Sequence, residues 1–193
     1  MDGERGGGLG ANAHYTLMKT KEIIALAPMV QELAEDNAHL YLWTTNNFLP
    51  DALEVMKAWG FRYVTMVTWM KNRMGLGQYF RGLTEHCLFG VRGKLPYKVI
   101  DGKRQQGKTG FFEKKREHSR KPVQMREMIE KVSYPPFIEL FARERFDGWD
   151  AWGNEICFTG KTKMADRSIS ASVNQTVQTN LAEDVRKASI SRH

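Results

Sequence analysis

The sequence of 193 residues predicts an α/β protein in which helices cover both faces of a sheet. Two observations lead to this prediction: helix-like and strand-like segments alternate along the chain, and the strand-like segments are apolar on both faces. The length fits one domain with an appendage. We expect a Gly-rich leader over residues 1–12, a folded domain over 13–160, and a polar, disordered tail over 161–193.

The helices are predicted from the spacing of apolar residues and from the residues at helix ends. Over 20–34, apolar side chains recur on one helical face. Pro28 leaves two alternatives open, a single interrupted helix or two short helices joined by a turn. Further helices are expected over 49–61, ended by Gly60, and over 121–133.

Strands are predicted where short runs of apolar, β-branched and aromatic residues are bounded by turn residues. These runs cover residues 38–46, 61–71, 85–93 and 135–143. We interpret residues 94–120 as a long basic connection. Trp149 and Trp152, which follow the last predicted strand, are assigned to a turn.

The net charge of +7 is concentrated in one stretch. Residues 92–131 contain thirteen Lys and Arg against five Asp and Glu, a local excess of +8. Clustered cations suit a polyanion such as nucleic acid, although a solvated loop that keeps the protein soluble explains the charge equally well. Tyr97, Phe111 and Phe112 lie in this stretch and either stack on single-stranded bases or pack the loop down.

Several classes of protein are disfavoured by the sequence. Cys87 and Cys157 both lie in apolar segments, which indicates a reducing, intracellular setting. The five His and two Cys form no zinc-binding pattern, so no metal site is predicted. The sequence contains no apolar run long enough to cross a bilayer and no signal peptide after Met1.

Polar residues gather at the end of the last predicted strand. Glu139 lies within the strand, Arg143 just past it, and Asn154 in the following turn. At such an edge a carboxylate can accept hydrogen bonds from a ribose diol, and Arg and Asn can bind the polar ends of a ligand. The alternative is that Glu139 pairs internally and Asn154 caps a turn. We favour the ligand site, because a carboxylate between apolar neighbours is costly to bury without a partner.

Two other segments resemble anion sites. In 116–122 (REHSRKP), Lys121 lies near a helix start, where it either meets an anion or is an ordinary solvated cation. Gly8-x-Gly10-x-x-Ala13 superficially matches a dinucleotide fingerprint. That fingerprint works only between a strand and a helix, and no strand-like segment precedes these glycines, so we disfavour a phosphate-binding loop.

Taken in order, six segments resemble the MT-A70 family of N6-adenine methyltransferases, particularly its short phage and bacterial members. They are HYTLM, LYLWTTN, WGFRYVTMVTWMK, EHCLFGVRGK, REHSRKP and IELFARERFDGWDAWGNEI, and they span Ala13 to Ile156 in the family's order and spacing. The resemblance implies that 13–160 is a methyltransferase domain. It also implies a Rossmann-like sheet in permuted order, with the catalytic segment preceding the cofactor-binding strand.

The resemblance further implies which residues contact the two substrates. Positions that match those holding S-adenosyl-L-methionine are Lys121, Glu139, Arg143 and Asn154, with Arg145 and Glu155 as weaker matches. Positions that match those around the target adenine are Tyr15, Glu85 and Ser119.

One family motif does not occur in this sequence. In the family, Asp-Pro-Pro-Trp ends a central strand and precedes a Gly-rich loop, whereas here the nearest likeness, Tyr134-Pro135-Pro136-Phe137, lies elsewhere. We therefore interpret residues 1–12 as that loop without its strand, and we assign no catalytic residue. The motif positions the weakly nucleophilic amine of an extruded adenine, and positioning can lower a barrier by about 7–11 kcal/mol. A missing strand would also leave unpaired backbone in the sheet.

Two functions follow from this resemblance. The first is methyl transfer from S-adenosyl-L-methionine to adenine N6 in DNA, impaired in this chain because the tetrapeptide is missing. The second is a catalytically inactive nucleic-acid-binding subunit that forms a dimer or works beside an active partner chain. DNA is favoured over RNA only by the likeness to phage and bacterial members, so an RNA adenine methyltransferase stays open. The expected location is the cytoplasm of a bacterial or phage-infected cell, without a membrane partner.

Overall fold

The computed structural model describes residues 18–75, 77–94, 97–115 and 120–153. The predicted leader and the predicted tail therefore lie outside the described residues. The elements are, in chain order, α1 (Thr20–Ile24), α2 (Ala27–Leu33), β1 (Ala38–Thr44), the 3₁₀ helix η2 (Asn46–Phe48), α3 (Leu49–Ala58), β2 (Arg62–Met70), β3 (Thr84–Arg92), β4 (Val99–Ile100), β5 (Lys103–Arg104), β6 (Gly110–Phe112), α4 (Val123–Val132), β7 (Phe137–Leu140) and β8 (Trp149–Trp152).

The central sheet is mixed, with the strand order β1-β3-β2-β6. Both β1 and β2 run antiparallel to β3, and β6 runs parallel to β2. A separate pair of parallel strands is formed by β7 and β8, and β4 and β5 form a small antiparallel hairpin. A mixed sheet with helices packed on it confirms the predicted α/β class.

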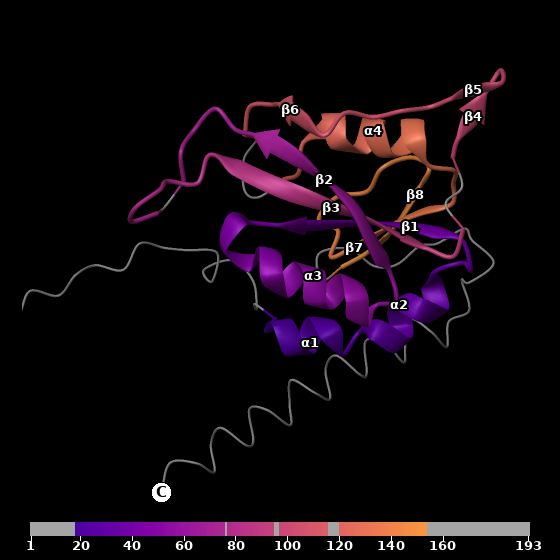
Figure 1. Ribbon diagram of the computed structural model, residues 1–193, viewed down its shortest axis with the longest axis horizontal. Coiled ribbons are helices and arrows are strands. Elements are labelled where there is room, and N and C mark those ends of the chain that lie inside the picture. The colour runs from indigo at the N-terminus through magenta and orange to yellow at the C-terminus, as the bar shows by residue number, and fades with distance from the viewer. Residues whose placement is uncertain (1–17, 76, 95–96, 116–119, 154–193) are drawn as a thin grey trace, which may run out of the picture.

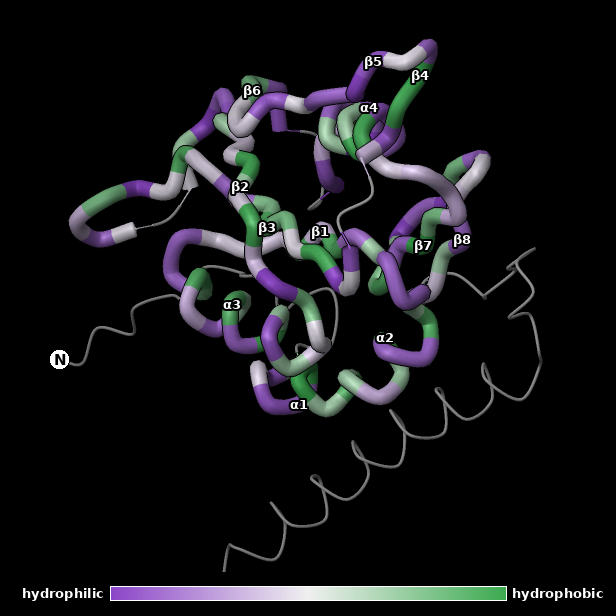
Figure 2. Tube along the Cα trace, turned by 45° about the vertical axis from the view of Figure 1, so that its right-hand side comes forward, coloured by the Kyte–Doolittle hydropathy of each residue, from purple (hydrophilic) through white to green (hydrophobic). Residues whose placement is uncertain are grey.

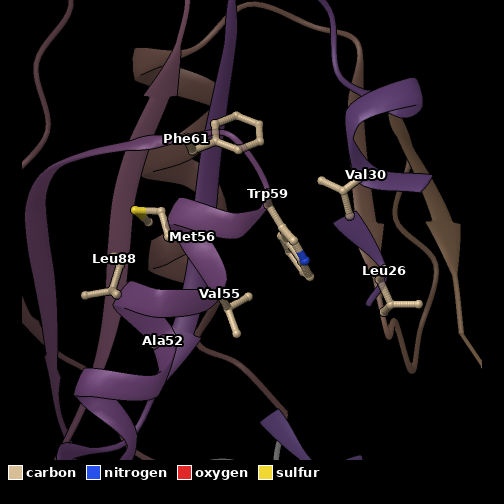
Figure 3. Packing of buried hydrophobic residues seen from close by; sticks show 8 residues of the cluster. All are labelled: Leu26, Val30, Ala52, Val55, Met56, Trp59, Phe61 and Leu88. Carbon is tan, nitrogen blue, oxygen red and sulfur yellow. The ribbon is translucent and has the colours of Figure 1, made fainter. Parts of the chain in front are cut away.

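Helices cover both faces of the central sheet, as predicted. Helices α1, α2 and α3 lie on one face and α4 lies on the other (Figure 1). On the first face, Met56 of α3, Trp59 just after α3 and Leu88 of β3 belong to one buried cluster. Figure 3 shows Met56 on the side of Leu88 and Trp59 on the side of Val30. On the second face, Met125 of α4 packs on Cys87, whose pKa burial raises to about 12. Because side chains alternate along a strand, consecutive β3 residues supply the two cores.

The helix ends follow the local sequence. The two-helix alternative for residues 20–34 is correct, since Pro28 lies in the first turn of α2, where a proline costs no hydrogen bond. Helix α3, predicted over 49–61, ends at Ala58, and Gly60, the glycine predicted to terminate it, follows with φ +84°. The backbone N–H of Phe61 donates to the Met56 carbonyl at 3.0 Å, which closes the helix and turns the chain into β2.

The predicted C-terminal part needs two corrections. The strand predicted over 135–143 is shorter, and Trp149 and Trp152 lie in a strand, β8, where a turn was predicted. The indole of Trp149 stacks on Phe137 of β7, with ring centroids 4.8 Å apart.

Segment 94–120, interpreted as a connection, contains β4, β5 and β6. Strands this short carry little periodic signal, and their non-local pairing decides their conformation.

Two glycines in left-handed turns allow a matched test of the packing. At Gly93 (φ +66°) an added Cβ would lie 2.1 Å from the Asp36 carbonyl oxygen, whereas at Gly102 (φ +72°) it would meet nothing within 4 Å. Gly102→Ala should lower the free energy of unfolding by about 1–2 kcal/mol for its backbone conformation. Gly93→Ala should cost about 1–3 kcal/mol more, because overpacking adds to the same strain. Urea denaturation measures both, and equal losses would contradict the packing at Gly93.

Candidate active site

The candidate site lies at one end of the central sheet, where β1 and β2 finish and β3 begins. The antiparallel register places Trp69 of β2 opposite Glu85 of β3, and Lys71 follows immediately after β2. The chain also reaches this end just before α4, which brings Lys121 next to Glu85. Three segments far apart in sequence therefore meet at one carboxylate.

Glu85 is held between two lysines. Its Oε2 accepts a hydrogen bond from Lys121 Nζ at 2.8 Å, and its Oε1 accepts one from Lys71 Nζ at 3.2 Å. The Lys121 ammonium also lies 4.7 Å from the centroid of the Trp43 ring. Burial by itself would raise the pKa of Glu85, but the charges and hydrogen bonds of Lys121 and Lys71 outweigh it and hold the pKa below its usual value. Glu85 is therefore ionised at neutral pH.

Lys71 was not selected from the sequence. Its side chain is 11% exposed, against 36% for Lys121, so it is the more deeply held of the two cations. The signal that could have found it is the succession of the predicted strands 61–71 and 85–93, since a lysine at the end of one strand can face an acid that opens the next.

A neutral histidine of β3 links β2 to the 3₁₀ helix η2 beside the site. His86 Nε2 donates to Asn46 Oδ1 at 2.6 Å, and His86 Nδ1 accepts from the Thr68 hydroxyl at 3.0 Å. Asn46 in turn donates from Nδ2 to the Thr84 hydroxyl at 3.2 Å. Burial lowers the pKa of His86, although Glu85 opposes this effect. The network was not predicted, and it joins η2, β2 and β3 beside the candidate site.

Glu139 makes the internal pair that the sequence left open as an alternative. Its Oε2 accepts from Arg126 Nη2 of α4 at 2.9 Å. The Arg126 guanidinium lies 3.1 Å from the centroid of the Phe146 ring, which fixes it from the opposite side. The Glu139 side chain nevertheless remains 32% exposed, so it can also accept hydrogen bonds from a ligand.

A groove of about 1030 Å³ runs between β1 and β7. It is lined by three of the predicted cofactor-binding residues, Lys121, Glu139 and Arg143. Arg145 is exposed and does not line it. The other predicted site residues, Tyr15, Ser119, Asn154 and Glu155, lie outside the described residues.

Both strands that border this groove have a free edge. Within the described chain, β1 pairs with β3 alone and β7 with β8 alone. Residues 38–43 of β1 and all of β7 line the groove. The Nδ1 atom of His39 is hydrogen-bonded to the Ser133 hydroxyl at 2.7 Å, but its buried Nε2 has no partner among the described residues.

The fold and the site together define a class of protein. An α/β sheet with a carboxylate and cations at its strand ends, beside a large groove, is the usual arrangement of an enzyme that binds a nucleotide-like ligand. The profile of the MT-A70 family matches residues 5–155, which is most of the chain. The protein therefore belongs to the MT-A70 family, whose methyltransferases use S-adenosyl-L-methionine as methyl donor.

Individual relatives agree with this assignment. The type II methyltransferase M.MunI of Mycoplasma sp is 34% identical over 149 residues, which cover 76% of this chain and 61% of the relative. The human N(6)-adenosine-methyltransferase catalytic subunit METTL3 is 29% identical over 133 residues, 63% of this chain and 22% of the relative. The N(6)-adenosine-methyltransferase MT-A70-like of Arabidopsis thaliana is 29% identical over 128 residues, 61% of this chain and 18% of the relative. The chain thus spans between 18% and 61% of the length of these relatives.

None of the helices in the described ranges is both long and apolar enough to cross a membrane. The same ranges contain no group of three His, Cys, Asp or Glu that could hold a metal ion.

Replacing Glu85 tests the central ion pair. Glu85→Gln leaves Lys71 and Lys121 without their carboxylate and should lower the free energy of unfolding by about 1–2 kcal/mol, less than a fully buried pair because the groups are partly exposed. The matched control is Glu144→Gln, which breaks the pair with Arg120, whose side chain is 53% exposed, and should change stability by less than about 0.5 kcal/mol. Equal effects in urea denaturation would contradict the role of Glu85.

Proposed function

We propose that the protein transfers a methyl group from S-adenosyl-L-methionine to the N6 amine of adenine in DNA, in the cytoplasm of a bacterial cell. The observation that carries the proposal is the contact between Lys121 and Glu85 at 2.8 Å. The first residue is predicted to bind the cofactor and the second to lie beside the target adenine, so methyl donor and acceptor would meet there. DNA is favoured because M.MunI, a bacterial type II methyltransferase, shares more identity than the adenosine methyltransferases compared above.

The residues of the groove suit the cofactor. S-adenosyl-L-methionine supplies a methyl group activated on a sulfonium, and it carries a ribose diol, a carboxylate and an ammonium. Glu139, partly exposed in the groove, can accept from the ribose hydroxyls, and Lys121 and Arg143 can bind the carboxylate. We extend this role to Arg145, Asn154 and Glu155 on the basis of the family resemblance. The charged and polar side chains of the groove therefore fit S-adenosyl-L-methionine.

Glu85 can hold the adenine amine. A carboxylate with a lowered pKa is a good hydrogen-bond acceptor but a weak base. We therefore infer that Glu85 positions the amine rather than removing its proton, with Tyr15 and Ser119 on the same base. When Lys121 binds the cofactor, Lys71 still compensates the negative charge of Glu85, because it donates a hydrogen bond to the other carboxylate oxygen.

We further propose that one more strand occupies the part of the groove between the edges of β1 and β7 and joins them in a single Rossmann-like sheet of permuted order. Lys121, Glu139 and Arg143 would stay accessible to the cofactor. The free edges of β1 and β7 and the unpaired Nε2 atom of His39 support this arrangement. The strand would end in Asp-Pro-Pro-Trp beside Glu85 and supply the acceptors for the amine. Methyl transfer by the present chain would then be impaired.

A methyl-transfer assay tests this proposal. The present chain is compared with a form extended upstream by roughly 15–30 residues, enough for a strand and its connections, ending in the tetrapeptide. With labelled cofactor and adenine-containing duplex DNA, the extended form should produce N6-methyladenine at least about 100-fold faster, since positioning is restored. An extended form with the tetrapeptide Asp changed to Ala is the control. Equal rates for the extended form and the present chain would refute the added strand.

Glu139→Ala should abolish cofactor binding, because the carboxylate that accepts from the ribose is removed. Tyr15→Ala should spare cofactor binding, since Tyr15 is assigned to the adenine. Arg126→Met removes the same ion pair from the other side and should retain most of the affinity. Isothermal titration calorimetry with S-adenosyl-L-methionine measures all three. If Arg126→Met loses as much affinity as Glu139→Ala, Glu139 acts only as the counterion of Arg126.

A second function is favoured by the basic excess over residues 92–131. The chain would then be a catalytically inactive subunit that binds nucleic acid, as a dimer or beside an active partner. This function predicts salt-sensitive binding of nucleic acid without methyl transfer, even by the extended form. An RNA adenine methyltransferase is distinguished from both functions by a methyl-transfer assay with RNA and DNA of the same sequence, in which only the RNA would be methylated.

A further inference from the structure

The hairpin between β2 and β3 continues beyond the candidate site and carries two exposed aromatic rings. Tyr79 is 93% exposed and Phe80 is 92% exposed, more than any other large hydrophobic side chain of the described residues. The hairpin projects away from the rest of the chain in both views (Figures 1 and 2). Apolar rings held in water by a projecting turn indicate a binding surface.

The hairpin is braced by hydrogen bonds between its two arms. The backbone N–H of Lys71 donates to the Leu83 carbonyl at 2.9 Å, and that of Gly75 donates to the Gly82 carbonyl at 2.7 Å. The Arg81 side chain donates from Nε to the Gly75 carbonyl at 3.1 Å. At Gly77 an added Cβ would lie 2.0 Å from the Phe80 carbonyl oxygen, so the tip turns where only glycine fits. The rings are therefore carried by a hairpin whose described residues, 71–75 and 77–83, are held by these contacts.

The charge of the hairpin matches a polyanion. Residues 71–83 contain Lys71, Arg73 and Arg81 and no Asp or Glu. The segment beside them is also basic: the backbone N–H of Lys115 donates to Asn72 Oδ1 at 2.9 Å. Cations combined with exposed aromatic rings are the features with which proteins bind unstacked nucleotides, through phosphate neutralisation and base stacking. Lys71 is already paired with Glu85, whereas Arg73 and Arg81 have no carboxylate partner among the described residues. A protein partner would gain from the rings but not from these two arginines.

We propose that Tyr79 and Phe80 stack on DNA bases next to the target adenine and stabilise the strand from which it is turned out. The inference rests on the proposed function, since an adenine amine inside a duplex must leave the stack to be methylated. The hairpin grows from the same strand ends that carry Lys71 and Glu85, so bound DNA that reaches the site also reaches the rings. The occupant is therefore DNA with a disrupted stack.

The test is fluorescence anisotropy with a labelled DNA duplex that carries one mismatched adenine. The Tyr79→Ala/Phe80→Ala variant should bind at least about tenfold more weakly than the unsubstituted chain, since each stacked base contributes about 1–3 kcal/mol. Its affinity should keep the same salt dependence, because no cation is removed. Tyr63→Ala is the matched control: Tyr63 is 45% exposed near the start of β2, at the other end of the sheet, and its loss should change nothing.

The outcomes separate this inference from the proposed function. Equal DNA affinity for the double variant and the unsubstituted chain overturns the stacking role and leaves the proposed function standing. A change of oligomeric state in light scattering, with DNA affinity unchanged, would assign the rings to a protein contact and also overturns it. Calorimetry of the unsubstituted chain with S-adenosyl-L-methionine is independent of Tyr79 and Phe80, so a failure to bind there counts against the proposed function.

Discussion

The pairing of one carboxylate with two lysines holds the candidate site together. Glu85 lies at the start of β3, Lys71 follows β2 and Lys121 precedes α4. One acid therefore ties the β2–β3 hairpin to the segment that leads into α4. An ionised carboxylate this well buried is tolerated because both oxygens are bonded to cations. The same arrangement leaves Lys121 able to change partners, since Lys71 alone still compensates the charge.

The sequence predicted those features of the fold that depend on local chemistry. Pro28 and Gly60 set helix ends through restrictions on their own backbone, and these ends are found where they were expected. The strands β6 and β8 were missed because they are three and four residues long and are defined by their partners. In so short a segment, Trp149 and Trp152 look the same in a turn and in a strand.

The site was predictable to a similar extent. Family resemblance selected Lys121 and Glu85 separately, and the structure adds that they form one pair. Glu139 was selected as a ligand-binding acid, whereas its bond to Arg126 depends on how α4 lies against β7. Lys71 and His86 were missed, because their roles depend on the register between β2 and β3. Sequence patterns thus identify the kinds of groups in the site, and tertiary packing decides their partners.

Among the described residues β1 and β7 each have a free edge, and this has a consequence for the behaviour of the protein in solution. An unpaired strand edge is a template for any other extended backbone, and here two such edges border one apolar-lined groove. Molecules whose groove is not covered would add strands to one another. Self-association should therefore increase with protein concentration, and covering the groove would make the protein both better folded and easier to keep dispersed.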